Sequence, residues 1–228
     1  MLEALRASLI ERIGESRQVI LLIKLLEPQS PLIRDSQEVV ILRGIFYVSL
    51  YSILEFTIQG VVQEALRLIS NKSVPFKCFS GNFYSVALDS EFKSSRDSNE
   101  KKLIVKRLEL LEKQNSSESR SIDPSVLSMY FQNVDADTLK LIFKCFCIDD
   151  DFSSVSRYLL FVSEIKEKRN LISHGRESAY FVGQSTRAND LEIRFEAVQN
   201  ISNYIVDKFE ICLQELNFIT PEFREHYV

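Results

Sequence analysis

The stretch from residue 39 to residue 62 contains only two charged side chains, Arg43 and Glu55. The rest of it is apolar or uncharged, and it has no proline. An apolar run of this length that lacks period-2 alternation favours a helix over a strand. Because the run is apolar on nearly every side, the helix must be buried on most sides. We therefore predict a long central helix from about Ser36 to Ile69.

A membrane span is the alternative interpretation of the same stretch, since GIFYVSLYSILEFTIQGVV approaches the roughly 20 residues that a bilayer requires. Glu55 and Gln59 argue against it, because a carboxylate at mid-membrane costs about 3 kcal/mol. The polar Ser49, Ser52 and Thr57 point the same way. We expect no membrane contact.

The remainder of the chain also has a helical pattern, with 6 Gly and 5 Pro among 228 residues. A first helix is expected from Leu2 to Leu26, ended by Pro28 and Pro31. Later helices are expected at 97–113, at 154–173 and at 196–216. Two more are expected between them, one that begins with Asp123 as cap and Pro124 as first helical residue, and one capped by Asp135 or Asp137. Only residues 191–195, LEIRF, resemble a strand.

The fold class predicted from this pattern is all-α. Residues 71–96 are expected to be irregular, and KQNSSESRSIDPS at 113–125 has the composition of a polar linker too short to separate two domains. We predict a single domain over 1–228, with a core at about 36–216 and an irregular insertion at about 71–122.

Charge and cysteine content exclude several classes of function. The 28 basic residues against 32 acidic ones give a net charge of −4, so any contact with nucleic acid must be local. Cys78, Cys145, Cys147 and Cys212 form no CxxC pair, and two histidines cannot complete a familiar zinc site with them. We expect reduced thiols, no metal, no cofactor and a cytoplasmic location. The first residues also lack the apolar region of a secretory signal.

The segment EKRNLISHGRE, residues 167–177, combines an arginine and a histidine at the expected end of one helix. Arg169 falls on an apolar stripe formed by Tyr158, Val162, Ile165 and Ile172. A guanidinium on a packed face needs a partner or a polar cleft, because arginine cannot lose its proton. Two alternatives follow: a buried ion pair with Glu55, whose disruption costs about 3 to 5 kcal/mol, or an anion site.

His174 lies on another line of the same helix, one turn beyond Asn170, and Gly175 is the expected C-cap. The helix C-terminus favours the imidazolium form, which suits acid–base chemistry near neutral pH. A cap that only bonds its own backbone is the alternative. Five helical steps turn about 140°, so Arg169 and His174 can converge only because the helix ends there or through a partner chain.

The order Arg169, Asn170, three residues, His174 and Gly175 resembles the RxxxxH motif of the HEPN superfamily. The stretch VSLYSILEFTIQGVVQEAL at 48–66 resembles the LY…E helix of stand-alone HEPN proteins, with Tyr51 and Glu55 at the matching positions. The segment DADTLKLIFKCFCI, up to residue 148, is similar to the one that precedes the motif helix. The resemblance extends over most of residues 36–216.

This resemblance implies a metal-independent ribonuclease with an RNA substrate, acting as a homodimer in which two motifs share one cleft. It implies that His174 and Arg169 are catalytic, with Asn170 positioning the imidazole ring and Glu55 supporting Arg169 or the motif helix. The expected RNA-binding rim consists of Lys166, Lys168 and Arg176.

One position departs from the family pattern. HEPN toxins that are silenced by a nucleotidyltransferase antitoxin carry a nucleotide-accepting tyrosine two residues after the histidine, where this chain has Arg176; Tyr180 has the wrong spacing. Regulation would then involve a different antitoxin or defence-system partner. Two other interpretations remain: a non-catalytic HEPN-fold adaptor that binds RNA or protein, and a helical structural subunit whose motif is coincidental.

Overall fold

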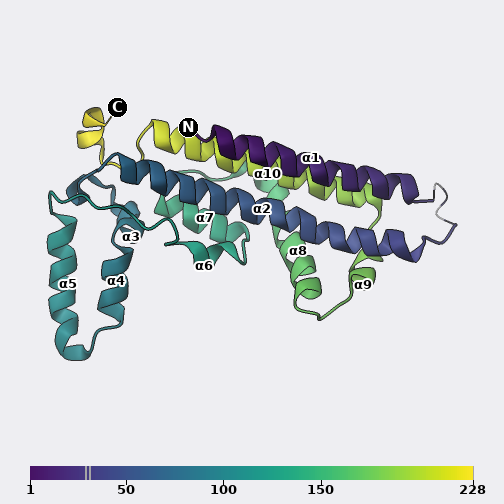
Figure 1. The fold of residues 1–228 in the computed structure, drawn as a ribbon, viewed down its shortest axis with the longest axis horizontal. Coiled ribbons are helices and arrows are strands. Elements are labelled where there is room, and N and C mark those ends of the chain that lie inside the picture. The colour runs from purple at the N-terminus through teal and green to yellow at the C-terminus, as the bar shows by residue number, and fades with distance from the viewer. Residues whose placement is uncertain (29, 31, 228) are drawn as a thin grey trace. The chain divides into compact units, whose positions relative to one another are not determined.

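The computed structural model describes residues 1–28, 30 and 32–227, and this part of the chain is helical without a β-strand (Figure 1). The all-α prediction is confirmed. The α-helices are α1 (Glu3–Leu26), α2 (Gln37–Asn71), α3 (Tyr84–Ala87), α4 (Asp89–Arg96), α5 (Glu100–Gln114), α6 (Ser128–Phe131), α7 (Ala136–Cys145), α8 (Ser156–Ser173), α9 (Ala179–Gly183) and α10 (Ala188–Gln214). The described residues also form 3₁₀ segments: η1 (Phe76–Cys78), η2 (Gly81–Phe83) and η3 (Ser153–Val155) lie between α-helices, and η4 (Pro221–His226) follows α10.

Residue contacts divide the chain into two compact units. Unit 1 consists of Met1–Gly60, Phe131–Thr138 and Phe152–Val206. Unit 2 consists of Val61–Tyr130, Leu139–Asp151 and Asp207–Val228. The single domain expected from the sequence stays a prediction, and each unit is described by itself.

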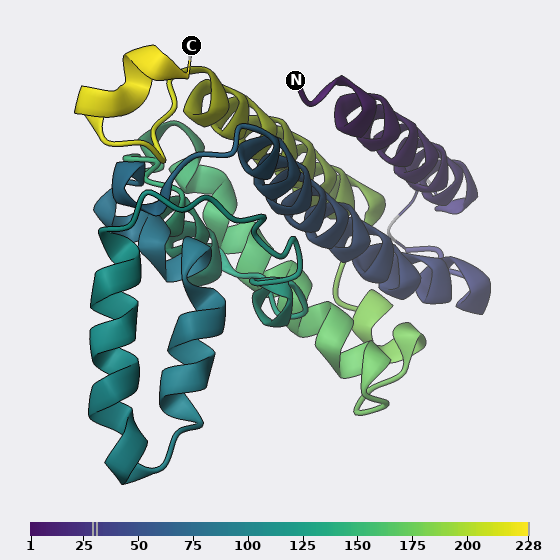
Figure 2. The same ribbon diagram turned by 60° about the vertical axis from the view of Figure 1, so that its left-hand side comes forward.

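Unit 1 is built on helices that run alongside one another, namely α1 and the unit 1 parts of α2 and α10 (Figure 2). The hydroxyls of Ser16 and Ser49 are 2.8 Å apart and join α1 to α2. The rings of Phe46 and Phe195, 6.4 Å apart, join α2 to α10. The core is therefore apolar, with a polar contact between the two N-terminal helices.

Helix α2 is long and apolar enough to cross a membrane, and 56% of its most apolar window is buried inside the protein. That burial is typical of the core helix of a globular protein and agrees with the predicted central position. Its buried Arg43 donates to Asp35 at 2.7 Å and also pairs with Glu27, which compensates the buried charge. The predicted end of α1 is confirmed at Leu26, whereas Pro31 lies outside the described residues.

The short helix α9 approaches α2 unusually closely in unit 1. A Cβ added at Gly44 would collide with the backbone of Ala179, and one added at Gly183 would collide with the carbonyl oxygen of Val40. Backbones can approach this closely only where side chains are missing. The two glycines therefore fix α9 against α2.

Unit 2 has an aromatic core around the end of α7 and the end of α10. The ring centroids of Phe146 and Phe209 are 4.9 Å apart, and those of Phe83 and Phe146 are 5.6 Å apart. The other large buried phenylalanines of this unit are Phe76, Phe79, Phe143 and Phe218. They hold the 3₁₀ turns η1 and η2 in place.

The expectation of an irregular segment at 71–96 holds as far as Phe83, where the chain forms turns and the 3₁₀ segments η1 and η2, and is wrong beyond it, because α3 and α4 follow. Helix α4 has no buried residue, so its sequence carries no apolar periodicity that could reveal it. It is stabilised instead by the Lys93–Asp89 ion pair at 2.6 Å, one turn apart, with acids in the first turn and bases in the last. The helix expected at 97–113 is confirmed as α5.

The possible strand at 191–195 is also wrong, since α10 begins at Ala188 instead of near Glu196. Leu191 and Phe195 are buried one helical turn apart, while Ile193 between them is exposed. A run of only five residues is compatible with the two-residue period of a strand and with the 3.6-residue period of a helix, and here the burial of Leu191 and Phe195 shows that the helix is formed.

Of the two predicted aspartate caps, one is confirmed. The Oδ1 of Asp135 accepts from the Thr138 N–H at 2.8 Å at the start of α7. Asp123 accepts from the Ser125 N–H at 2.9 Å, but the residues after it form a turn, and α6 begins only at Ser128. Asp123 is therefore a turn residue and not a helix cap.

Candidate functional site

The motif segment lies at the C-terminus of α8, as predicted. Gly175 adopts a left-handed conformation with φ of 67°, and its N–H donates to the Ile172 carbonyl at 3.0 Å. The Arg176 N–H donates to the Leu171 carbonyl at 2.9 Å. This pair of bonds is a Schellman motif. Its left-handed residue is Gly175, as predicted for the end of this helix, and His174 itself occupies the C-cap position.

Arg169 points from α8 onto α2, and its side chain is only 14% exposed. Its guanidinium carbon lies 3.8 Å from the centre of the Tyr51 ring. Its Nη2 is 3.6 Å from the Oε2 of Glu55, so the expected ion pair is present. The position on the packed stripe beside Val162 and Ile165, both buried, agrees with the sequence pattern.

Two hydrogen bonds complete the surroundings of the guanidinium. Nη2 donates to the carbonyl oxygen of Gln132 at 2.9 Å, and Nη1 donates to the Oδ1 of Asn170 at 2.8 Å. The cation is thus held by a ring face, a carboxylate and two neutral acceptors. Such an arrangement holds the guanidinium in place, and Glu55 is the one charged group among these neighbours.

The Glu55 carboxylate is less buried than the sequence suggests, with 35% of its side chain exposed. The Arg169–Glu55 pair is therefore less buried than its apolar sequence neighbours led us to expect. Those neighbours lie on the other faces of α2, while Glu55 opens to solvent beside Arg169. We expect the coupling of such a pair to be near that of a surface ion pair.

Tyr51 ties the segment before α7 to α2. Its hydroxyl oxygen accepts from the Val134 N–H at 2.7 Å, a buried hydrogen bond. Burial raises the pKa of Tyr51. The phenol therefore stays neutral and keeps the chain at 132–134 against α2, where the Gln132 carbonyl meets Arg169.

These residues line an open pocket of about 400 Å³ in unit 1. Its lining consists of Val48, Tyr51, Ser52, Glu55, Gln132, Arg169 and Ser173. One cation, one carboxylate and two serine hydroxyls give it the character of a small polar site. Arg169 is the positively charged side chain that an anionic group entering this pocket would meet.

His174 does not line this pocket; its side chain is exposed, and its backbone N–H donates to the Asn170 carbonyl at 3.1 Å. The side chain of Asn170 is used elsewhere, because it accepts from Arg169 and donates to the Oδ1 of Asn133 at 3.4 Å. Within the described residues, no hydrogen bond joins Asn170 to the imidazole ring. Arg169 and His174 diverge, as the 140° turn of an unbroken helix predicts.

The three rim residues have different surroundings. Lys166 pairs with Asp135 at 2.7 Å, Lys168 donates to the Ser185 hydroxyl at 3.3 Å, and Arg176 is exposed. Burial raises the pKa of Asp135, but hydrogen bonds from Lys166 and from Thr138 outweigh it and lower that pKa to about 2. Lys166 is therefore committed to a structural partner more firmly than the other two.

Sequence reasoning missed the contribution of residues 132–134. Gln132 acts through its backbone carbonyl and Val134 through its backbone N–H, which every residue except proline could supply. Side-chain identity at these positions therefore carries no signal. Asn133, which contacts Asn170, is the only one of the three whose residue type matters to the site.

Comparison with known proteins identifies a family. The RiboL-PSP-HEPN family model matches residues 11–211. No curated protein and no solved structure matches the chain significantly. A HEPN domain indicates an RNA-related function, as a nuclease or as an adaptor. Because the match covers most of the 228 residues, including both α2 and the motif at the end of α8, the chain belongs to the RiboL-PSP-HEPN family of the HEPN superfamily.

Proposed function

We propose that this protein is a metal-independent endoribonuclease that cleaves RNA as a homodimer, serving as a toxin or antiphage effector in the cytoplasm. The observation that carries the proposal is the Arg169 guanidinium, which is largely buried yet lines an open pocket at the helix end that bears His174. A cation in this position suits a phosphate better than it suits packing.

The proposed reaction uses the RNA's own 2′-hydroxyl as nucleophile. A neutral His174 takes the proton of that hydroxyl while its oxygen attacks phosphorus. The bond to the 5′-oxygen breaks, and a protonated His174 from the second copy supplies the proton to this leaving group. Arg169 stabilises the charge on the phosphate oxygens, and the products are a 2′,3′-cyclic phosphate and a 5′-hydroxyl.

A second copy is needed because the motif holds one histidine and the reaction needs two protonation states. A stripe on α2 that is exposed at Ile45 and Ser52 and half-buried at Val48 supports this pairing. Ile45, Val48 and Ser52 follow one another at helical spacing, and Val48 and Ser52 themselves line the Arg169 pocket. An apolar patch that leads into a polar pocket is the expected pattern for an interface that shares a site.

Substrate contacts beyond the cleft would come from Lys168 and Arg176, since Lys166 is paired with Asp135. Contacts of this kind hold the RNA backbone without reading its sequence. With Arg176 at the position of the nucleotide-accepting tyrosine, we propose that regulation depends on a protein antitoxin or another defence-system partner.

One observation favours the adaptor alternative. The guanidinium of Arg169 already has Tyr51, Glu55, Gln132 and Asn170 around it, which satisfies much of its bonding capacity without a ligand. In an adaptor the same set would fix the end of α8, and RNA or protein would bind without turnover.

The deciding experiment induces the wild type, His174→Ala and His226→Ala in a bacterial host and follows growth and total RNA. His226, the other histidine, lies in η4 of unit 2 and is the matched control. A nuclease toxin predicts growth arrest and RNA fragments with the wild type and with His226→Ala, but not with His174→Ala. Intact RNA in all three cultures would instead support the adaptor.

A further inference from the structure

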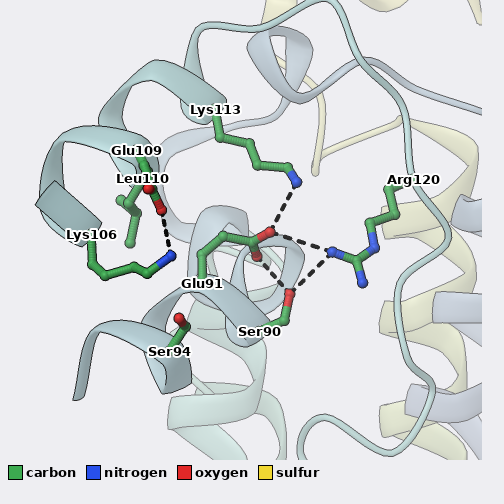
Figure 3. Close-up of a pocket in the computed structure, with 8 residues that line it drawn as sticks. All are labelled: Ser90, Glu91, Ser94, Lys106, Glu109, Leu110, Lys113 and Arg120. Carbon is green, nitrogen blue, oxygen red and sulfur yellow. Dashed lines mark hydrogen bonds and ion pairs between the residues drawn. The ribbon is translucent and has the colours of Figure 1, made fainter. Parts of the chain in front are cut away.

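The two helices α4 and α5 of unit 2 form an antiparallel hairpin, called the arm below (Figure 1). Neither helix contains a buried residue. Polar contacts join the inner side of α5 to α4. Glu91 of α4 pairs with Lys113 of α5 at 3.0 Å and with Arg120 at 3.4 Å (Figure 3). The arm is therefore held together by charges and not by an apolar core.

The inner face of α5 lines a pocket of about 390 Å³ between the two helices, with Lys106, Leu110 and Lys113 directed into it (Figure 3). Its charged groups already pair with one another, since Lys106 also contacts Glu109 at 2.7 Å. The residues on the inner side of α5 thus line this pocket. The exposed apolar residues on its outer side do not, and they require a separate explanation.

The outer face of α5 carries a stripe of exposed apolar side chains. Ile104, Leu108 and Leu111 are 59%, 55% and 53% exposed, and Val105 beside them is 53% exposed. Scattered exposed leucines are ordinary, but a row on one helix face marks an interaction surface. The spacing of four and then three residues is that of a coiled-coil seam.

The charges beside the stripe indicate which helix covers it. Residues 100–107 hold four basic side chains and one acidic one, whereas residues 108–114 hold two acidic and one basic. Lys101 and Glu112 lie at opposite ends of the stripe on the same flank. In an antiparallel pair of α5 helices, a two-fold axis between Lys106 and Arg107 brings each Lys101 to the Glu112 of the other copy. The helix is thus complementary to itself.

We propose that the outer face of α5 binds the same face of α5 in a second copy of this chain, antiparallel and two-fold symmetric. The contact buries Ile104, Leu108 and Leu111 of both copies in one apolar seam, with a Lys101–Glu112 pair at each end. This interface is separate from the motif at the end of α8, because it uses only residues of the arm.

The test measures the molar mass of the full chain by light scattering over a range of concentrations. Leu108→Glu places a carboxylate from each copy in the apolar seam beside the two-fold axis, so we expect it to halve the mass of the assembly. The matched control is Ile10→Glu on α1, the same apolar-to-acidic change at a residue outside the arm that is 68% exposed. This control should leave the mass unchanged. Both sites are exposed, so both variants should fold, and circular dichroism checks this.

A charge swap tests the register. Lys101→Glu and Glu112→Lys should each weaken the assembly, because each puts like charges at both ends of the seam. The double variant should restore it, because the pairs re-form with reversed sign. An unchanged mass for Leu108→Glu overturns the proposal, and double-variant association no stronger than that of the single variants overturns the antiparallel register.

The result is independent of the proposed nuclease. If the motif faces also pair, the wild type is a tetramer or larger assembly, and Leu108→Glu leaves a dimer that still cleaves RNA. If the motif faces do not pair, the wild type is a dimer through α5 and the variant is a monomer. The masses therefore distinguish failure of one proposal from failure of the other.

Discussion

The guanidinium carbon of Arg169 lies 3.8 Å from the ring centre of Tyr51, and the hydroxyl of the same tyrosine accepts the Val134 N–H at 2.7 Å. One side chain of α2 thus contacts the motif arginine with its face and the segment before α7 with its edge. The two contacts can be separated by mutation.

Tyr51→Phe keeps the ring beneath Arg169 but leaves the buried Val134 N–H without its acceptor. We expect a loss of about 1 to 3 kcal/mol in the free energy of unfolding, with RNA cleavage retained. Tyr51→Leu removes the cation–π contact as well, worth about 0.5 to 2 kcal/mol, and should also impair cleavage. Urea unfolding and a cleavage assay measure both effects. Equal stability of the two variants would contradict this division of roles.

The Arg169–Glu55 pair is accessible to a double-mutant cycle with Arg169→Ala and Glu55→Gln. Because Glu55 is 35% exposed, we expect a coupling energy of about 0.2 to 1 kcal/mol, far below that of a fully buried pair. Chemical unfolding of the wild type, both single variants and the double variant provides the four values. A coupling above about 3 kcal/mol would mean that the pair behaves as a buried one after all.

His174 and Arg169 should differ in what their loss does to stability. We expect His174→Ala to lower the cleavage rate about 100- to 10,000-fold while the melting temperature stays near that of the wild type, because the side chain is exposed. Arg169→Ala should lower both, since its guanidinium holds α2, α8 and the Gln132 carbonyl together. A melting scan beside the assay separates the two. Cleavage by both variants at the wild-type rate would remove the catalytic assignment.

The Asp135–Lys166 pair predicts a dependence of stability on pH. The folded-state pKa of Asp135, about 2, lies below its ordinary value of 3.8, so its stabilising contribution is present above about pH 4 and is lost as the pH falls toward 2. Asp135→Asn should therefore be less stable than the wild type near pH 7, by about 1 kcal/mol for a partly exposed pair, and the difference should shrink below pH 4. The exposed Asp149→Asn serves as the control. A difference between Asp135→Asn and the wild type that does not shrink between pH 5 and pH 2 would exclude the linkage.

The proposed chemistry predicts its own products. Cleavage should resist EDTA, leave 2′,3′-cyclic phosphate ends, and stop on DNA or on RNA with a 2′-O-methyl group at the cut. Excess His174→Ala mixed with the wild type should lower activity more than dilution does, because mixed dimers lack one proton carrier. Mass spectrometry of the fragments identifies the ends. Products with a 3′-hydroxyl, or a requirement for magnesium, would show that the mechanism is wrong.

The longer helices were predictable from the sequence, including the charged α5, whereas the eight-residue α4 was not. The core helix α2 and the Gly175 end of α8 follow from periodicity and capping rules. Helix α4 did not follow, because it is only eight residues long and its single apolar residue, Phe92, gives no periodicity. The start of α10 was obscured by the alternation at 191–195, which only the burial of Leu191 and Phe195 resolves.

The candidate site divides in the same way. Arg169 and Glu55 could be paired in advance because each is a charge on an apolar helix face. The acceptor at Gln132 is a backbone atom, so its position depends on the path of the chain and leaves no trace in the residue type. The same holds for the engagement of Asn170 with Arg169, because an amide side chain fits several partners equally well.

The glycine contacts between α2 and α9 also constrain how this protein can tolerate insertions. Residues 174–178 bridge the end of α8 and the start of α9, and α9 cannot move away from α2 without opening the backbone contacts at Gly44 and Gly183. Both ends of the bridge are therefore fixed, and an inserted residue would have to bulge into solvent and redirect His174. The length of the bridge is therefore set by the packing of α9 against α2, two helices that contain neither Arg169 nor His174.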